Sequence, residues 1–130
     1  MSPLIVLVTI AALLLYAYMG TRVGPARRKH GIAAPATTGH PDFERVFRVQ
    51  MNTLEWLPIF LPVLWIAAAY WDARIIAAIG VVWIIGRFMY MEGYIAEAGK
   101  RSMGFLVQAL ATLALLLASI VGAVMQLIAP

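Results

Sequence analysis

Four long apolar stretches follow one another along the chain, separated by short polar segments. Residues 1–21 carry no charge, and the later stretches cover about residues 43–71, 73–97 and 102–128. Each stretch is long enough to cross a hydrocarbon core of about 30 Å as a helix. The pattern therefore predicts an all-α integral membrane protein whose four transmembrane helices form a single domain over residues 1–130.

The first stretch has an alternative interpretation as a cleaved signal peptide. Such a peptide has a basic N-terminal region and a cleavage site of small residues, and residues 1–21 lack both features. Behind this stretch, residues 22–42 are rich in Gly, Pro, Thr and basic residues and are predicted to be the only long polar loop. Residues 71–74 join the second and third stretches so closely that we expect antiparallel neighbours.

Composition and charge set the class and the orientation. With 63% hydrophobic and 12% charged residues, the chain lies outside the range of soluble domains. Much of the net charge of +4 comes from basic residues within residues 22–45 and at Lys100 and Arg101, on the two links that the positive-inside rule assigns to the cytoplasm. This charge is an orientation signal with some attraction to anionic lipid, not a nucleic-acid signature. The short links favour a bacterial inner membrane, with the active site towards the cytoplasm.

The residues that most often hold metals are scarce. The chain has no cysteine, so any thiol chemistry must come from a bound thiol. His30, His40 and Asp42 share the first link, but the two histidines are ten positions apart in a segment rich in Gly, Pro and Thr. This spacing does not preorganise metal ligands, and we therefore expect no metal site.

Polar side chains recur at helical spacing inside two stretches that are otherwise apolar. Residues at i, i+4 and i+7 share one helix face, which brings together Arg48, Asn52 and Glu55 on the second stretch. Ionisable groups at membrane depth normally face a bundle interior or an aqueous cavity and mark a functional site. On the third stretch and just beyond it, the same period collects Arg87, Tyr90, Tyr94, Glu97 and Arg101.

These two stripes define a candidate binding cavity. If the two faces meet, the cavity is cationic, with hydrogen-bond acceptors and phenols between the guanidinium groups. Arginine binds carboxylates through two parallel hydrogen bonds, glutamate can hold an ammonium group, and asparagine and tyrosine can hold amides or carboxylates. The combination suits a zwitterionic ligand with several carboxylates, such as a small peptide cofactor.

Two other interpretations of the stripes stay open. The charges can line the path of a small channel or transporter subunit, although the chain shows no selectivity filter, broken helix or repeat. They can also be structural ion pairs that fix the register of the bundle, namely Arg48 with Glu55, and Arg87 with Glu92 or Glu97.

Several segments of the chain resemble one protein family. Residues 43–58, FERVFRVQMNTLEWLP, resemble the signature segment of the MAPEG proteins, the membrane-associated proteins of eicosanoid and glutathione metabolism. The likeness extends to residues 26–28, to residues 87–94 and to Arg101, and it covers nearly the whole chain. The family includes microsomal glutathione transferases, the leukotriene-conjugating synthase and the membrane prostaglandin E synthase.

The resemblance implies a homotrimer of left-handed four-helix protomers, with glutathione bound between adjacent subunits near the cytoplasmic end. Trp56 joins the predicted site because it adjoins Glu55, although the family often carries a tyrosine at this position. The positions that match the family's glutathione contacts are Arg27, Arg48, Gln50, Asn52, Glu55, Tyr90 and Tyr94.

The resemblance also implies which side chains carry the chemistry. Arg101 matches the arginine assigned to thiolate activation, and Arg28 matches a second, accessory arginine. Ser102 matches a serine proposed to assist the thiol in the prostaglandin synthase, or it is the N-cap of the fourth helix. The implied activity is a membrane glutathione S-transferase that acts on a lipophilic electrophile or a lipid hydroperoxide. The alternatives are a non-catalytic lipid-binding scaffold and a glutathione-dependent isomerase.

Overall fold

A computed structural model describes residues 2–129, so Met1 and Pro130, the ends of the predicted domain, lie outside the described residues. The described chain contains no strand, and all of its long helices are apolar enough and long enough to span a membrane. The predicted four-helix membrane bundle is therefore confirmed. The elements are α1 (Pro3–His30), α2 (Pro41–Tyr70), α3 (Ala73–Ala96), the short 3-10 helix η1 (Ala98–Arg101) and α4 (Ser102–Ile128).

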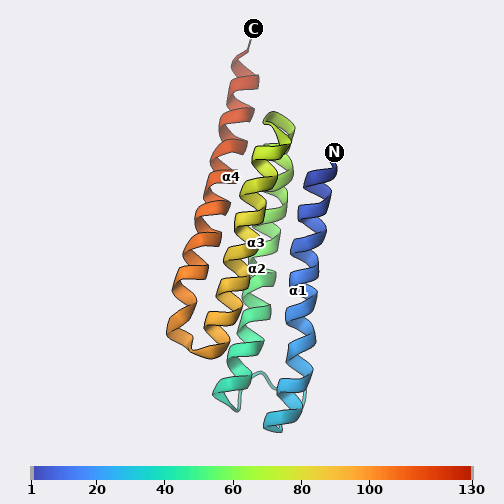
Figure 1. The fold of residues 1–130 in the computed structure, drawn as a ribbon, viewed down its shortest axis with the longest axis vertical. Coiled ribbons are helices and arrows are strands. Elements are labelled where there is room, and N and C mark those ends of the chain that lie inside the picture. Colours follow the sequence, from blue (N-terminus) through green and yellow to red (C-terminus); the bar gives the residue numbers. More distant parts are fainter. Residues whose placement is uncertain (1, 130) are drawn as a thin grey trace.

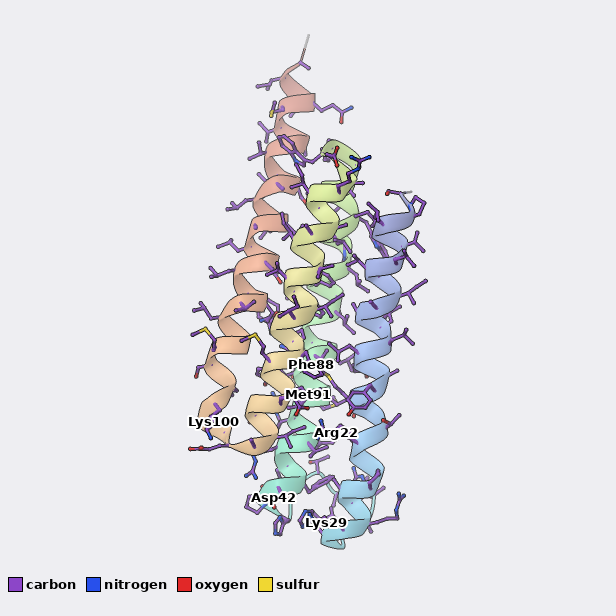
Figure 2. All side chains as sticks on the ribbon, in the orientation of Figure 1. Arg22, Lys29, Asp42, Phe88, Met91 and Lys100 are labelled. Atoms are coloured by element: carbon purple, nitrogen blue, oxygen red, sulfur yellow. The ribbon has the colours of Figure 1, made fainter. Side chains whose placement is uncertain are left out.

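The helices run up and down along one axis, with α1 and α4 on opposite sides of α2 and α3 (Figure 1). Helix α1 packs on α2 and α3, and α4 packs on α3 and α2. The α1–α2 link and η1 lie at the same end of the bundle, and both chain termini point towards the other end. Figure 2 shows Lys29, Asp42 and Lys100 at the end that carries the two links.

Aromatic stacking and glycine contacts fix how the helices pack. The rings of Phe60 and Trp83 stack with centroids 3.9 Å apart, and both side chains are fully buried. A Cβ atom on Gly86 would lie 2.6 Å from the backbone nitrogen of Gln108, and a Cβ on Gly104 would collide with the backbone of Tyr90. Small residues allow such close approach, and close approach is a main source of helix association in lipid. The two glycines thus set the register of α4 against α3.

The first helix is longer than predicted, and the predicted loop is correspondingly shorter. Residues 22–30 continue α1, so the link contains only residues 31–40. Ala, Arg and Lys are strong helix formers, and basic side chains in the last turn stabilise the helix C-terminus. The helix ends at Gly31, which has a φ of 66° and whose N–H donates to the carbonyl of Arg27. The first charge therefore marks the end of the apolar stretch and not the end of the helix.

Candidate functional site

A pocket of about 540 Å³ opens at the η1 end of the bundle, within the range of roughly 300–1,000 Å³ typical of small-molecule sites. Helices α2, α3 and α4 and the short η1 all contribute side chains to it, whereas α1 contributes none. The predicted meeting of the two polar faces is therefore present in the structure. The lining residues are Arg48, Asn52, Tyr90, Tyr94, Arg101, Ser102, Phe105, Leu106 and Ala109.

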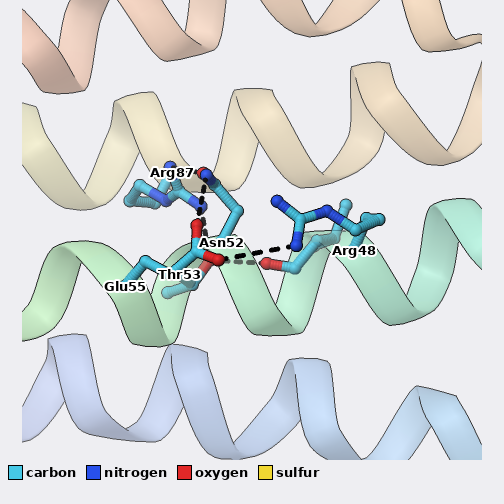
Figure 3. A network of polar contacts seen from close by, with 6 residues as sticks. Arg48, Asn52, Thr53, Glu55 and Arg87 are labelled. Carbon is cyan, nitrogen blue, oxygen red and sulfur yellow. Dashed lines mark hydrogen bonds and ion pairs between the residues drawn. The ribbon is translucent and has the colours of Figure 1, made fainter. Parts of the chain in front are cut away.

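The α2 wall of the pocket is a short polar network (Figure 3). Asn52 Nδ2 donates to Glu55 Oε2 at 3.1 Å, and Arg48 Nη1 donates to Glu55 Oε1 at 3.5 Å. The side chains of Arg48 and Glu55 are 49% and 54% exposed. Glu55 does not itself line the pocket, but it is bonded to two residues that do. The structural ion pair between Arg48 and Glu55 exists, and it leaves both groups accessible to a ligand.

Arg87 links this wall to α3 from within the bundle. Its side chain is fully buried; Nη1 donates to Asn52 Oδ1 at 3.1 Å and Nη2 to Thr53 Oγ1 at 2.5 Å. The guanidinium also lies 4.2 Å from the ring centroid of Tyr90. Thr53 was not predicted as part of this network, although a buried arginine requires acceptors on the facing helix.

The predicted ion pairs between Arg87 and the acidic residues of α3 are wrong. Glu92 Oε1 instead accepts from Arg22 Nη1 at 2.9 Å, and Glu97 pairs with Lys100 at 3.2 Å. Five positions of separation put Glu92 on a different helix face from Arg87, and Glu97 lies beyond the last residue of α3. Glu97 therefore drops out of the polar stripe.

The wall opposite α2 is aromatic and cationic. The rings of Tyr90 and Tyr94 lie with centroids 5.5 Å apart, and the guanidinium of Arg101 lies 5.2 Å from the Tyr94 ring. Arg101 Nη1 donates to the carbonyl of Ala98 at 2.7 Å, which ties the side chain to η1. A guanidinium has five N–H donors, so Arg101 retains donors for a ligand.

Ser102 lines the pocket beside Arg101, but the N-cap interpretation is wrong. Ser102 is the first residue of α4, the cap position belongs to Arg101, and no side chain caps the helix. Because η1 runs directly into α4, its carbonyl groups are placed to accept from the N–H groups of the first turn of α4, so this turn does not need a capping side chain. Ser102 Oγ instead donates to the carbonyl of Gly99 at 3.3 Å.

Three predicted site residues lie on the α1 side of the bundle, outside the pocket. Arg27 Nη1 donates to the carbonyl of Ala36 at 2.6 Å. The amide of Gln50 lies against Gly20 of α1, and Arg28 is exposed in the last turn of α1. One protomer therefore does not bring all the predicted contacts together.

Trp56 does not line the pocket but packs against a residue that does, Phe105. Phe105 was not among the predicted site residues. The Trp56 ring packs edge-on against Phe105, with centroids 5.6 Å apart. Phe105, Leu106 and Ala109 line the pocket from α4. As apolar residues in an apolar helix they carry no distinctive signal, but helical spacing from Arg101 and Ser102 would have found them.

The spacing argument about the first link was wrong, because the link folds back. The rings of His30 and His40 stack at 3.9 Å, and donor atoms of His30, His40 and Asp42 lie within 4.8 Å of one another. The carboxylate of Asp42 accepts from Arg45 Nη2 at 2.5 Å, and His40 Nδ1 accepts from the backbone N–H of Asp42. These contacts tie the end of α1 to the start of α2. The expected absence of a metal ion here stays a prediction.

The fold and the pocket define a class: a four-helix integral membrane protein that carries a cationic, tyrosine-lined pocket at one end of its bundle. The chain belongs to the MAPEG family, whose sequence model matches residues 5–121. The family resemblance stated from the sequence is therefore confirmed.

Three relatives illustrate this membership. The chain is 46% identical over 121 residues to an uncharacterized protein of Synechocystis, covering 93% of this chain and 88% of the relative. It is 42% identical over 104 residues to human microsomal glutathione S-transferase 2, covering 80% and 71%. It is 40% identical over 121 residues to the leukotriene C4 synthase of Cavia porcellus, covering 87% and 81%.

Proposed function

We propose that this chain is a membrane glutathione S-transferase, folded as one domain over residues 1–130. The observation that carries the proposal is the pocket itself, because its polar lining consists largely of side chains predicted to bind or activate glutathione. Relatives named glutathione S-transferase and leukotriene C4 synthase support the same chemistry. The side chains that connect prediction and pocket are Arg48, Asn52, Tyr90, Tyr94 and Arg101.

Glutathione carries two carboxylates, one ammonium group and two amides, and the pocket together with the adjoining Glu55 offers partners for each. In this proposal Arg48 binds a carboxylate through its guanidinium fork, and Glu55 holds the ammonium group. Asn52 and the two tyrosine hydroxyls bind carboxylate or amide oxygens. Trp56 acts indirectly, through its contact with Phe105.

Arg101 is the proposed activating group for the thiol. A thiol with an ordinary pKa near 8.5 is mostly protonated at neutral pH, and a nearby guanidinium stabilises the nucleophilic thiolate. The thiolate sulfur then forms a bond to an electrophilic carbon of a lipophilic substrate that enters from the bilayer, while the bond from this carbon to a halide or an epoxide oxygen breaks and its electron pair leaves with that atom, the epoxide oxygen then taking a proton. The same thiolate can attack a lipid hydroperoxide: the O–O bond breaks to give the lipid alcohol and a sulfenic acid of glutathione, and a second glutathione converts the sulfenic acid to the disulfide and water.

We further propose a homotrimer in which each site lies between two subunits. Arg27, Arg28 and Gln50 are on the α1 side, away from the pocket, so a neighbouring subunit is the natural source of these groups. Arg27 and Gln50 would then complete glutathione binding, and Arg28 would be an accessory acid. The basic links favour a cytoplasmic pocket in a bacterial inner membrane.

Ultraviolet difference absorption of the detergent-purified protein, titrated with glutathione at neutral pH, tests the function. The wild type should show a saturable thiolate band. Arg101→Ala should lose it by about tenfold or more, because removing an opposite charge raises a thiol pKa by at least about one unit. Lys100→Ala, which removes an exposed cation one residue away, is the matched control and should retain the band.

The opposite result would identify a different function. Glutathione binding by calorimetry with no thiolate band in the wild type would exclude thiol activation. That outcome would favour the lipid-binding scaffold.

A further inference from the structure

A fully buried arginine without an acidic partner lies behind the pocket. Among the residues that the structure describes, no carboxylate accepts a hydrogen bond from Arg87, and its Nε atom has no partner. A charge at membrane depth is costly, and charges retained there usually serve a function. Because Arg87 does not line the pocket, this function must act through its neighbours.

In the hydrogen bonds around Arg87, the guanidinium donates and both of its neighbours, Thr53 and Asn52, accept. Thr53 is itself fully buried, and its hydroxyl proton goes to the carbonyl of Val49 at 2.8 Å, so Thr53 Oγ1 can only accept from Arg87. The second guanidinium nitrogen donates to Asn52 Oδ1. Arg87 is thereby held in one orientation and presents a donor to Asn52.

We propose that Arg87 is a positioning residue that fixes the amide orientation of Asn52 and so makes this part of the pocket a donor site. With Oδ1 occupied by Arg87, the Nδ2 group of Asn52 faces Glu55 and the pocket. One N–H is bonded to Glu55, and the other remains for a ligand acceptor. The inference rests on the proposed function and names the ligand group as a carboxylate or peptide carbonyl oxygen of glutathione.

The Arg87–Asn52 hydrogen bond also orients the other polar side chains on this face of α2. Glu55 accepts from both Asn52 and Arg48, so its two oxygens are oriented by the amide that Arg87 holds. Without Arg87, the bond to Glu55 is the one contact left to orient the Asn52 amide, and Asn52 Oδ1 loses its donor, so the amide and the Glu55 carboxylate are held less firmly. Loss of Arg87 therefore disturbs binding without touching Arg101.

A double-mutant cycle tests this inference. The variants are Arg87→Met, Asn52→Ala and their combination, read by the glutathione Kd from the thiolate titration and by kcat and KM with a chlorodinitrobenzene. We expect Arg87→Met to raise the Kd and KM for glutathione about tenfold, as for loss of a charge-assisted hydrogen bond. The thiolate amplitude at saturating glutathione and kcat should change little. In the Asn52→Ala background, Arg87→Met should add less than about twofold.

Two controls separate positioning from folding. Arg22→Met removes an arginine that also bridges two helices, through Glu92, and it should leave Kd and kcat unchanged. Thr53→Val keeps the arginine and the side-chain shape but removes one acceptor, and it should raise the Kd in the wild-type background only. If Arg87→Met does not fold, Thr53→Val replaces it in the cycle.

The outcomes distinguish the inference from the function on which it rests. A wild type without saturable glutathione binding overturns the proposed function itself. A wild type that binds glutathione, with additive effects of the substitutions at positions 87 and 52, overturns only the positioning role. A roughly tenfold loss of kcat in Arg87→Met with an unchanged KM for glutathione would also contradict the positioning role.

Discussion

The Arg48–Glu55 pair at the edge of the pocket shows that one side chain can form an ion pair and still be open to a ligand. Arg48 and Glu55 form an ion pair at 3.5 Å while each side chain stays about half exposed. An exposed pair of this kind contributes only about 0–1 kcal/mol, so a ligand with opposite charges can replace it at little cost. The pair keeps both groups oriented before a ligand arrives, which lowers the entropic cost of binding.

The charge of Glu55 should recognise the ammonium group of glutathione. Glu55→Gln keeps an acceptor for Asn52 but removes the charge, so the variant should lose most of its preference for glutathione over a deaminated analogue. We expect the ratio of the two Kd values, roughly tenfold in the wild type, to fall towards one. Isothermal titration with both ligands measures it.

The control for this substitution is Glu92→Gln, which removes a carboxylate that pairs with Arg22 and not with a residue of the pocket lining. It should leave the preference intact. A Glu55→Gln variant that weakens both ligands equally would contradict the ammonium contact and assign Glu55 to structural pairing alone.

Sequence predicted the polar side chains of the site better than its apolar ones. Arg48, Asn52 and Tyr94 stand out because charge, amide and phenol groups are rare in helices of this hydropathy. Phe105 does not stand out, since one aromatic residue in an apolar helix has no distinguishing chemistry. The role of Thr53 depends on which helix face meets Arg87, and that is a property of packing between helices.

At the scale of elements, close packing between α3 and α4 holds the two walls of the pocket in register. Gly86→Ala places a Cβ atom 2.6 Å from the backbone nitrogen of Gln108, and a backbone atom cannot move aside as a flexible side chain can. We expect a loss of about 1–3 kcal/mol in stability, as for other overpacked interiors, and a lower thermal unfolding temperature in detergent.

Gly99→Ala is the matched substitution, because a Cβ at Gly99 would meet nothing within 4 Å. Its unfolding temperature should match that of the wild type. If Gly86→Ala were equally stable, α3 and α4 would not be held together by backbone contact.

Helix ends were the least predictable part of the elements. Hydropathy located all four apolar stretches, but it ended the first at residue 21, before Arg22, and α1 continues to His30. Charged residues terminate the apolar span without terminating the helix, because water satisfies their side chains while the backbone hydrogen bonds continue. This extension holds Arg27 and Arg28 on a rigid helix, which suits side chains proposed to reach a neighbouring subunit.

At the scale of the whole molecule, the separation between the pocket and the α1 side makes a quantitative prediction. If each site joins the pocket of one subunit to α1 of another, an Arg101→Ala subunit can still lend its Arg27 to a neighbour. Conversely, an Arg27→Ala subunit can still supply an intact pocket. Each variant alone should be impaired, and co-expression in equal amounts should restore roughly one quarter of the wild-type sites, as random mixing in a closed ring requires.

Thiolate absorbance per protomer, measured on co-expressed and on separately purified then mixed protein, tests this expectation. Mixing after purification is the control, because stable trimers should not exchange subunits and should stay impaired. Equal, low signals in both preparations would show that Arg27 acts within its own protomer, and about half of the wild-type signal in both would show that Arg27 has no role. Recovery only on co-expression would require sites shared between subunits, and it would explain why half of the cationic groups that resemble the family's site lie outside the pocket of a single chain.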